Sequence, residues 1–83
     1  MTDDQFNVLD ELYFVRSFGD LKSSLDLTED EIVLTLKELY KKGWVKVLRT
    51  VDDEVMGKVD WEKYSGFYFL ASKSGLMAHN TTE

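Results

Sequence analysis

Cysteine is absent from the 83-residue sequence, and histidine occurs once, as His79. Disulfide bonds and thiolate metal sites are therefore excluded, and His79 has no second histidine or cysteine with which to build a nucleophilic site. The five glycines are scattered along the chain, so no glycine-rich loop is present to bind phosphate. These absences predict a protein that is not an enzyme and that uses no cofactor and no small-molecule substrate.

Long apolar runs are missing as well. No stretch approaches the roughly 20 residues that a transmembrane helix requires. The first residues, MTDDQFN, are acidic and lack the basic and apolar regions of a signal peptide. We therefore expect a cytoplasmic protein that makes no contact with a membrane.

Basic residues are few, with 10 Lys and Arg against 16 Asp and Glu, for a formal net charge of −6. No segment is strongly basic, which argues against broad, nonspecific binding to polyanions. The length and the 43% content of hydrophobic residues predict one folded domain with a single core. We assign residues 1–79 to this domain and residues 80–83 to a frayed C-terminal tail.

Three helices are predicted in the first half of the chain, at residues 3–15, 18–25 and 28–42. Thr2 with Gln5, and Thr28 with Glu31, form capping boxes ahead of amphipathic runs. Gly43 follows the third helix, where glycine commonly ends a helix.

After Gly43 the apolar period changes from 3.6 to 2, which predicts a hairpin with strands at 44–51 and 66–71. The residues between them, 52–65, are long for a hairpin loop and are compatible with a strand extension, a short helical turn or a mobile tip. A brief helix is expected over 72–79. The predicted fold class is mainly α with a small antiparallel β-hairpin (α+β), with room for a short strand after the first helix.

The order of these elements resembles a winged helix-turn-helix domain, in which a three-helix core is followed by a hairpin called the wing. The resemblance rests on Leu21, Leu25, Leu27, Thr28, Ile32, Leu36, Leu39, Gly43, Trp44 and Val45. LKELYKKGWVKV is similar to the recognition helix and start of the wing in MarR-like and PadR-like regulators, and FYFLASKSGLMA to their return strand. The resemblance implies a transcriptional regulator whose third helix enters the major groove of double-stranded DNA.

Candidate DNA contacts lie on the third helix and the wing. Leu34 falls nearly opposite the apolar stripe of the helix, flanked by Lys37 and Lys41. Arg49 and Lys58 are the candidates on the wing. These cations are too few for tight binding by one chain, so we expect DNA binding to require a homodimer or a partner protein.

Acidic residues occupy the leading edge of both elements expected to face DNA. Glu29, Asp30 and Glu31 begin the third helix, where they favour the helix dipole but repel phosphate. The wing carries a further set of acids: Asp52, Asp53, Glu54, Asp60 and Glu62. This distribution leaves open an alternative function, in which the acidic surface contacts a basic protein.

Aromatic residues crowd between positions 61 and 69, next to the wing. Trp and Tyr are favoured at interaction hot spots, so Trp61, Tyr64 and Tyr68, together with Leu34, are the candidates for a protein contact. The simpler interpretation is that the long loop covers these rings and that Leu34 is a single exposed leucine.

Residues 52–63 show part of a calcium-loop pattern, with Gly57 at the sixth position and Asp60 at the ninth. Met56 and Lys63 stand where that pattern requires ligands. No metal site is therefore predicted.

Overall fold

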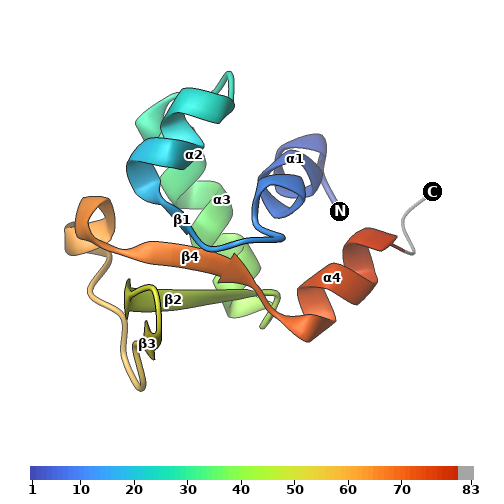
Figure 1. Cartoon of the computed structure of the whole chain (residues 1–83). Helices are drawn as coiled ribbons and strands as arrows, with labels where there is room; N and C mark the ends of the chain where they lie inside the picture. The colour runs from blue at the N-terminus through green and yellow to red at the C-terminus, as the bar shows by residue number, and fades with distance from the viewer. Residues whose placement is uncertain (81–83) are drawn as a thin grey trace.

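A computed structural model describes residues 1–80 as three helices packed on one face of a four-stranded sheet, followed by a fourth helix (Figure 1). The helices are α1 (Asp3–Glu11), α2 (Phe18–Ser24), α3 (Glu29–Lys41) and α4 (Lys73–Asn80), with a 3-10 helix, η1 (Trp61–Gly66). The strands are β1 (Arg16–Ser17), β2 (Val45–Thr50), β3 (Asp53–Glu54) and β4 (Tyr68–Ala71). Among the described residues, no helix is long and apolar enough to cross a membrane.

Both predicted capping boxes are confirmed. The Thr2 hydroxyl accepts a hydrogen bond from the Gln5 backbone N–H at 3.1 Å, and the Thr28 hydroxyl accepts one from the Glu31 N–H at 3.2 Å. In each box the N3 side chain also accepts from the cap's own N–H. These bonds satisfy backbone donors that a helix start otherwise leaves unpaired.

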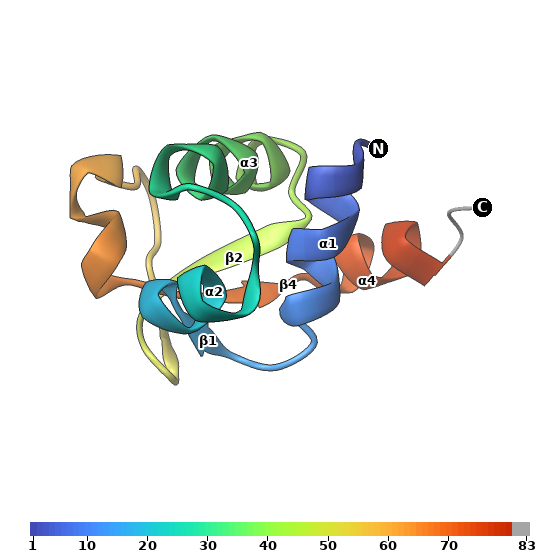
Figure 2. The same cartoon turned by 90° about the horizontal axis from the view of Figure 1, so that it is seen from above.

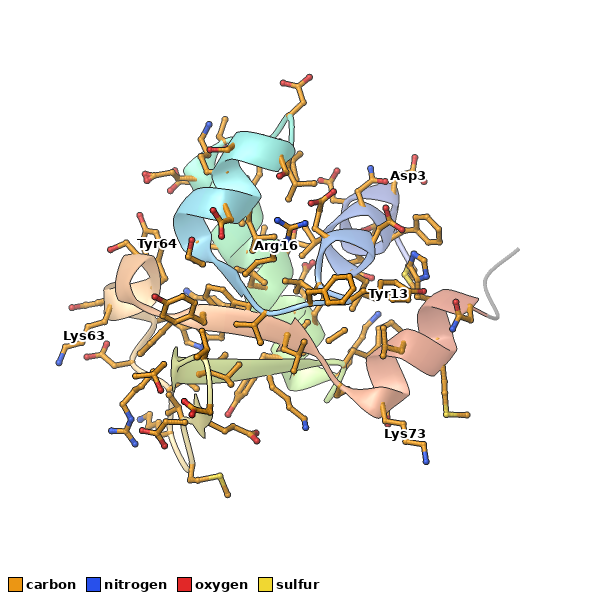
Figure 3. The ribbon with its side chains drawn as sticks, viewed as in Figure 1. Asp3, Tyr13, Arg16, Lys63, Tyr64 and Lys73 are labelled. Carbon is orange, nitrogen blue, oxygen red and sulfur yellow. The ribbon has the colours of Figure 1, made fainter. Side chains whose placement is uncertain are left out.

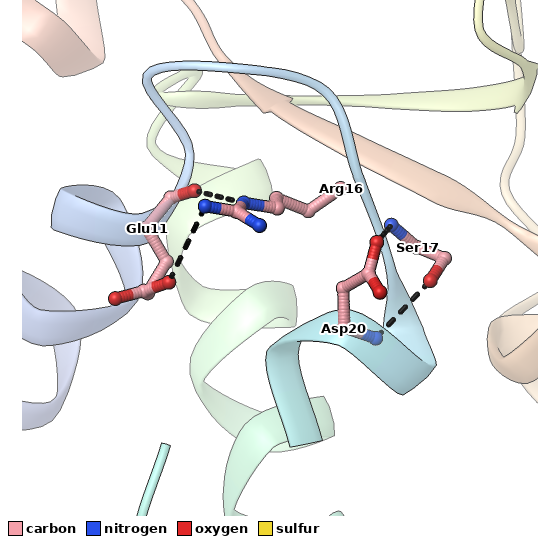
Figure 4. Close-up of polar contacts among 4 residues, drawn as sticks. All are labelled: Glu11, Arg16, Ser17 and Asp20. Carbon is pink, nitrogen blue, oxygen red and sulfur yellow. Dashed lines mark hydrogen bonds and ion pairs between the residues drawn. The ribbon is translucent and has the colours of Figure 1, made fainter. Parts of the chain in front are cut away.

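The first helix ends at Glu11, four residues earlier than its predicted end at 15. Arg16 and Ser17 must be extended to pair with β4, and a continued helix would prevent this pairing. Arg16 folds back so that its Nε donates to the Glu11 carbonyl oxygen at 3.3 Å (Figure 4). Ser17 with Asp20 then forms a third capping box, which starts α2 and was not predicted.

The sheet has the order β1-β4-β2-β3, and every pair in it is antiparallel. The predicted hairpin strands are present as β2 and β4, each slightly shorter than expected, and β1 is the short strand after the first helix. In the register of β2 with β4, Val47 lies opposite Phe69. Strand alternation sends both side chains to the helical side, where they are fully buried.

The core lies between this face of the sheet and the three helices. Ile32, Leu36 and Leu39, the predicted apolar stripe of α3, are all fully buried. The other fully buried large side chains are Val8, Leu9, Leu12, Leu21, Val47 and Phe69. Each helix therefore buries one apolar stripe and leaves its outer face exposed.

The start of α4 packs directly on the backbone that leads into β2. The Ser72 N–H donates to the Trp44 carbonyl oxygen at 2.9 Å, and the Ser72 hydroxyl donates to the Gly43 carbonyl oxygen at 2.6 Å. Gly75 is buried here, and a Cβ atom at this position would overlap the Trp44 carbonyl oxygen. Glycine at position 75 is thus required by the close approach of two backbones.

The end of α4 is held against α1 by aromatic contacts. The His79 ring stacks on Phe6 with 4.2 Å between centroids, and its Nδ1 lies 2.9 Å from the Tyr13 hydroxyl. The same hydroxyl donates to the Asn80 side-chain oxygen at 2.8 Å. Asn80, predicted to begin the frayed tail, is the last residue of α4, and residues 81–83 of that tail lie outside the described part of the chain.

Replacing Gly75 by Ala tests the packing of α4. We expect Gly75→Ala to lower the free energy of unfolding by roughly 1–3 kcal/mol, because the added methyl group overlaps a backbone carbonyl. Gly66→Ala is the matched control, since a Cβ at Gly66 meets no atom within 4 Å. Urea denaturation of the two variants measures the difference, and equal stabilities would contradict the close approach.

Candidate functional site

The acids at the start of α3 have different structural surroundings. The Glu31 carboxylate accepts a hydrogen bond from the Thr28 backbone N–H at 2.9 Å, and Glu29 accepts one from the Tyr64 hydroxyl at 3.4 Å. Asp30 lies instead on the wall of a groove beside α3. Glu31 therefore stabilises the start of α3, and Glu29 connects α3 to Tyr64 of η1.

The outward face of α3 is open to solvent. Leu34 is 59% exposed, and Lys37 and Lys41 are exposed one turn apart along the same side. The structure thus places these three predicted residues together on one helix face.

The segment between β2 and β4, residues 51–67, folds back against the helices; we call it the wing segment. It contains a short strand extension, β3, and the helical turn η1, which lies beside the start of α3 and at the end of the molecule opposite α4 (Figures 1 and 2). At the tip of the wing segment, the Gly57 carbonyl oxygen accepts a hydrogen bond from the Tyr40 hydroxyl of α3 at 3.4 Å.

Aromatic rings attach η1 to the rest of the domain. Tyr64 meets Phe18 of α2 edge-on, with 4.6 Å between centroids. Trp61 meets Tyr40 edge-on at 5.8 Å and lies parallel to Phe69 at 6.4 Å. These contacts fix η1 relative to α2, α3 and the sheet together.

The position of Tyr64 beside the start of α3 changes the pKa of its hydroxyl. Partial burial raises the pKa of the Tyr64 phenol above its ordinary value, and the negative charges of Glu29 and Asp30 raise it further. The folded state therefore favours the neutral phenol, which keeps the proton that it donates to Glu29. The contribution of the neutral phenol to the stability of the folded state is fully present below the ordinary tyrosine pKa. It is lost as the pH rises through the raised pKa.

The variant Glu29→Gln tests this coupling. Removing the charge removes one cause of the shift, so we expect the pKa of Tyr64 to fall toward the ordinary tyrosine value. A pH titration of the Tyr64 ring resonances by NMR measures the change. Asp3→Asn on α1, far from η1 in Figure 3, is the control and should leave the titration of Tyr64 unaltered.

A groove of about 350 Å³ runs between α3 and η1; we call it the α3–η1 groove. Its lining residues are Asp30, Val33, Leu34, Lys37, Trp61, Glu62 and Tyr64. The groove brings Leu34 and Lys37, predicted for DNA, beside Trp61 and Tyr64, predicted for a protein contact. The two candidate surfaces therefore overlap in space.

Cations gather in a second hollow, of about 210 Å³, between the end of β2 and the wing segment; we call it the basic hollow. It is lined by Arg49, Val55, Lys58, Asp60, Lys63 and Phe67. The predicted DNA contacts Arg49 and Lys58 thus lie together. Arg49 is also paired with Asp53, at 3.6 Å between Nε and a carboxylate oxygen.

Lys63 is a member of the basic hollow that the sequence did not reveal. Its neighbours in the chain form an acid-rich loop without a periodic pattern, which gives no signal that its side chain lies near Arg49. In Figure 3 Lys63 and Tyr64, although adjacent in η1, extend in different directions, Tyr64 toward the helices. Among its lining residues the hollow has three cations and one carboxylate, Asp60, and Asp53 beside it is paired with Arg49.

Two of the predicted residues lie apart from these clusters. Tyr68 is half-buried in β4, opposite Ser17 and Leu48 in register, and alternation places it on the face of the sheet away from Phe69 and hence from Trp61. Lys41 is the last residue of α3, far along the helix from the η1 end.

A further hollow, of about 360 Å³, lies between α1 and the turn that precedes α3. Its charged lining residues are all acids: Asp4, Asp10, Glu11 and Asp26. Within residues 1–80, no three acid or histidine side chains are arranged to hold a metal ion. This hollow is accordingly a negative surface on the side of α1.

The chain is similar in structure to a Multiple Antibiotic Resistance Repressor, MarR, with a TM-score of 0.75 and 22% sequence identity. The likeness covers 96% of this chain and 52% of that protein, so the chain spans about half of its length. No protein-family model and no curated protein sequence matches the chain significantly. The fold is that of a MarR-like winged helix, which confirms the predicted fold class.

Proposed function

We propose that the protein is a non-catalytic winged-helix module of a cytoplasmic transcription regulator, which binds double-stranded DNA through α3 and the wing segment. The observation that carries this proposal is the convergence of Arg49, Lys58 and Lys63 in the basic hollow. The outward face of α3 adds the exposed Lys37 and Lys41. The structural likeness to a repressor supports the same function.

The charges fit a weak contact by one chain. Five cations would neutralise about five phosphates, which corresponds to a salt slope of roughly −4 to −5 in a plot of log K against log[salt]. The acids of the wing segment and Asp30 reduce this attraction. We therefore expect useful affinity only when a second copy or a partner protein supplies further cations.

In the proposed DNA complex, Leu34 would contact the bases. It is exposed on the outward face of α3 between Asp30 on the preceding turn and Lys37 on the following one. An apolar side chain in a major groove contacts the methyl group of thymine, whereas lysines at its side contact phosphates. Leu34 would accordingly contribute to sequence preference and the lysines to affinity.

Fluorescence anisotropy with labelled duplex DNA, over a range of salt concentrations, tests the proposal. We expect Lys63→Glu to weaken binding and to reduce the magnitude of the salt slope by about 1, as expected when one phosphate contact is lost. Lys73→Glu, which makes the same charge change on the exposed start of α4, should alter the slope little. Absence of binding by the wild-type chain at low salt, or equal effects of the two variants, would contradict the proposal.

A second candidate function is contact with another protein, and the α3–η1 groove favours it. The groove joins an exposed leucine to two half-buried aromatic residues, Trp61 and Tyr64, with carboxylates at its sides. Such combinations of aromatic and apolar residues are typical of protein interaction surfaces.

A further inference from the structure

The α3–η1 groove is apolar on both walls. Val33 and Leu34 contribute from α3, and Trp61 and Tyr64 contribute from η1. Its volume of about 350 Å³ is at the lower end of the range of roughly 300–1,000 Å³ that is usual for binding pockets. A groove of this size and lining suits one or two inserted side chains.

The walls are fixed before any ligand arrives. Trp61 and Tyr64 are each held by ring contacts with other elements, at 4.6–6.4 Å between centroids. The start of η1 is capped by Asp60, whose carboxylate accepts a hydrogen bond from the Glu62 N–H at 3.2 Å. Binding would therefore require little ordering of η1, which lowers its entropic cost.

The charges of the groove select the ligand. Asp30 stands on the α3 wall and Glu62 on the η1 wall, and Lys37 is the one cation among the lining residues. Among the residues that the structure describes, no side chain forms a hydrogen bond or an ion pair with either carboxylate. The charge of Asp30 acts on Tyr64 only by raising the pKa of its phenol. Two such carboxylates beside an apolar floor repel phosphate and attract a cation.

We propose that the α3–η1 groove binds a protein segment that carries an apolar anchor next to a basic residue. The anchor, an aliphatic or aromatic side chain, inserts between Leu34 and Trp61. The Lys or Arg beside it pairs with the carboxylates of Asp30 and Glu62. The inference rests on the second candidate function, protein contact, and it does not require that the chain bind DNA.

A synthetic peptide array provides the probe. Its members carry a single Leu, Phe or Trp flanked at varied spacing by Lys or Arg, and two matched sets replace either the basic residues by Glu or the anchor by Ser. The best member is then titrated into the full-length, ¹⁵N-labelled chain. We expect it to shift the indole N–H signal of Trp61 and to leave that of Trp44, the other tryptophan, in place.

Two outcomes of the array and titration would overturn the inference. One is equal binding of the basic set and either matched set. The other is a perturbation centred on the acidic hollow beside α1 instead of on Trp61, which would show general attraction to a negative surface.

Two charge-reversal variants distinguish binding in the α3–η1 groove from general electrostatic attraction to an acidic protein. We expect Glu62→Lys to weaken peptide binding about five- to ten-fold, because it replaces an attractive charge by a repulsive one. Glu54→Lys makes the same charge change on an exposed residue of β3 outside the groove and should leave the affinity within about two-fold. Equal losses in the two variants would overturn the inference. Leu34→Ser, at an exposed position, tests the anchor contact without altering charge and should also weaken binding.

Failure of this inference is distinguishable from failure of DNA binding. Glu62→Lys removes an acid near the basic hollow, so DNA affinity should be unchanged or higher in the variant that loses the peptide. A chain that binds the peptide but no DNA would leave the groove assignment standing. A chain that binds DNA but no peptide would remove the groove assignment alone.

Discussion

The positions of both candidate surfaces depend on Phe69, which is buried in β4, one of the two inner strands of the sheet. β4 lies between β1 and β2, and Phe69 is opposite Arg16 on one side and Val47 on the other. Its ring is fully buried and parallel to that of Trp61. The same side chain therefore joins the sheet to the core and positions η1 beside α3. Together with the ring contacts of Trp61 with Tyr40 and of Tyr64 with Phe18, this stacking holds the wing segment against the helices.

The position of η1 gives the outer surface of α3 two different sides. On one side the helix faces η1 across an apolar groove with carboxylates, and along its length it presents Lys37 and Lys41 to solvent. Leu34 and Lys37 belong to both surfaces. A protein segment seated in the groove would cover residues that the DNA-binding proposal also uses, so the two ligands would compete for α3. Such competition is a simple physical means of coupling a partner protein to DNA binding.

Each acid at the start of α3 has a structural role, although its charge repels phosphate. Glu31 completes the capping box, Glu29 accepts the hydrogen bond of Tyr64, and Asp30 faces the groove. All three also lie where the helix dipole favours negative charge. Their presence is explained by the stability of the helix and by the attachment of η1. The consequence is a weaker attraction to phosphate at the start of α3, which the basic hollow offsets only in part.

Residue patterns within single segments were sufficient to predict most of the local elements of this protein. The capping boxes at Thr2 and Thr28, the change of period after Gly43 and the exposed position of Leu34 depend on residues within a few positions of one another, and each of these predictions is confirmed. The capping box of Ser17 with Asp20 is equally local, but it was not predicted. The tertiary structure alone decided which distant residues meet. It placed Lys63 beside Arg49, separated Tyr68 from Trp61, ended α1 early so that β1 pairs with β4, and stacked His79 on Phe6. These contacts join segments far apart in the chain, and they arise from the packing of the whole core, which no local pattern of residues encodes.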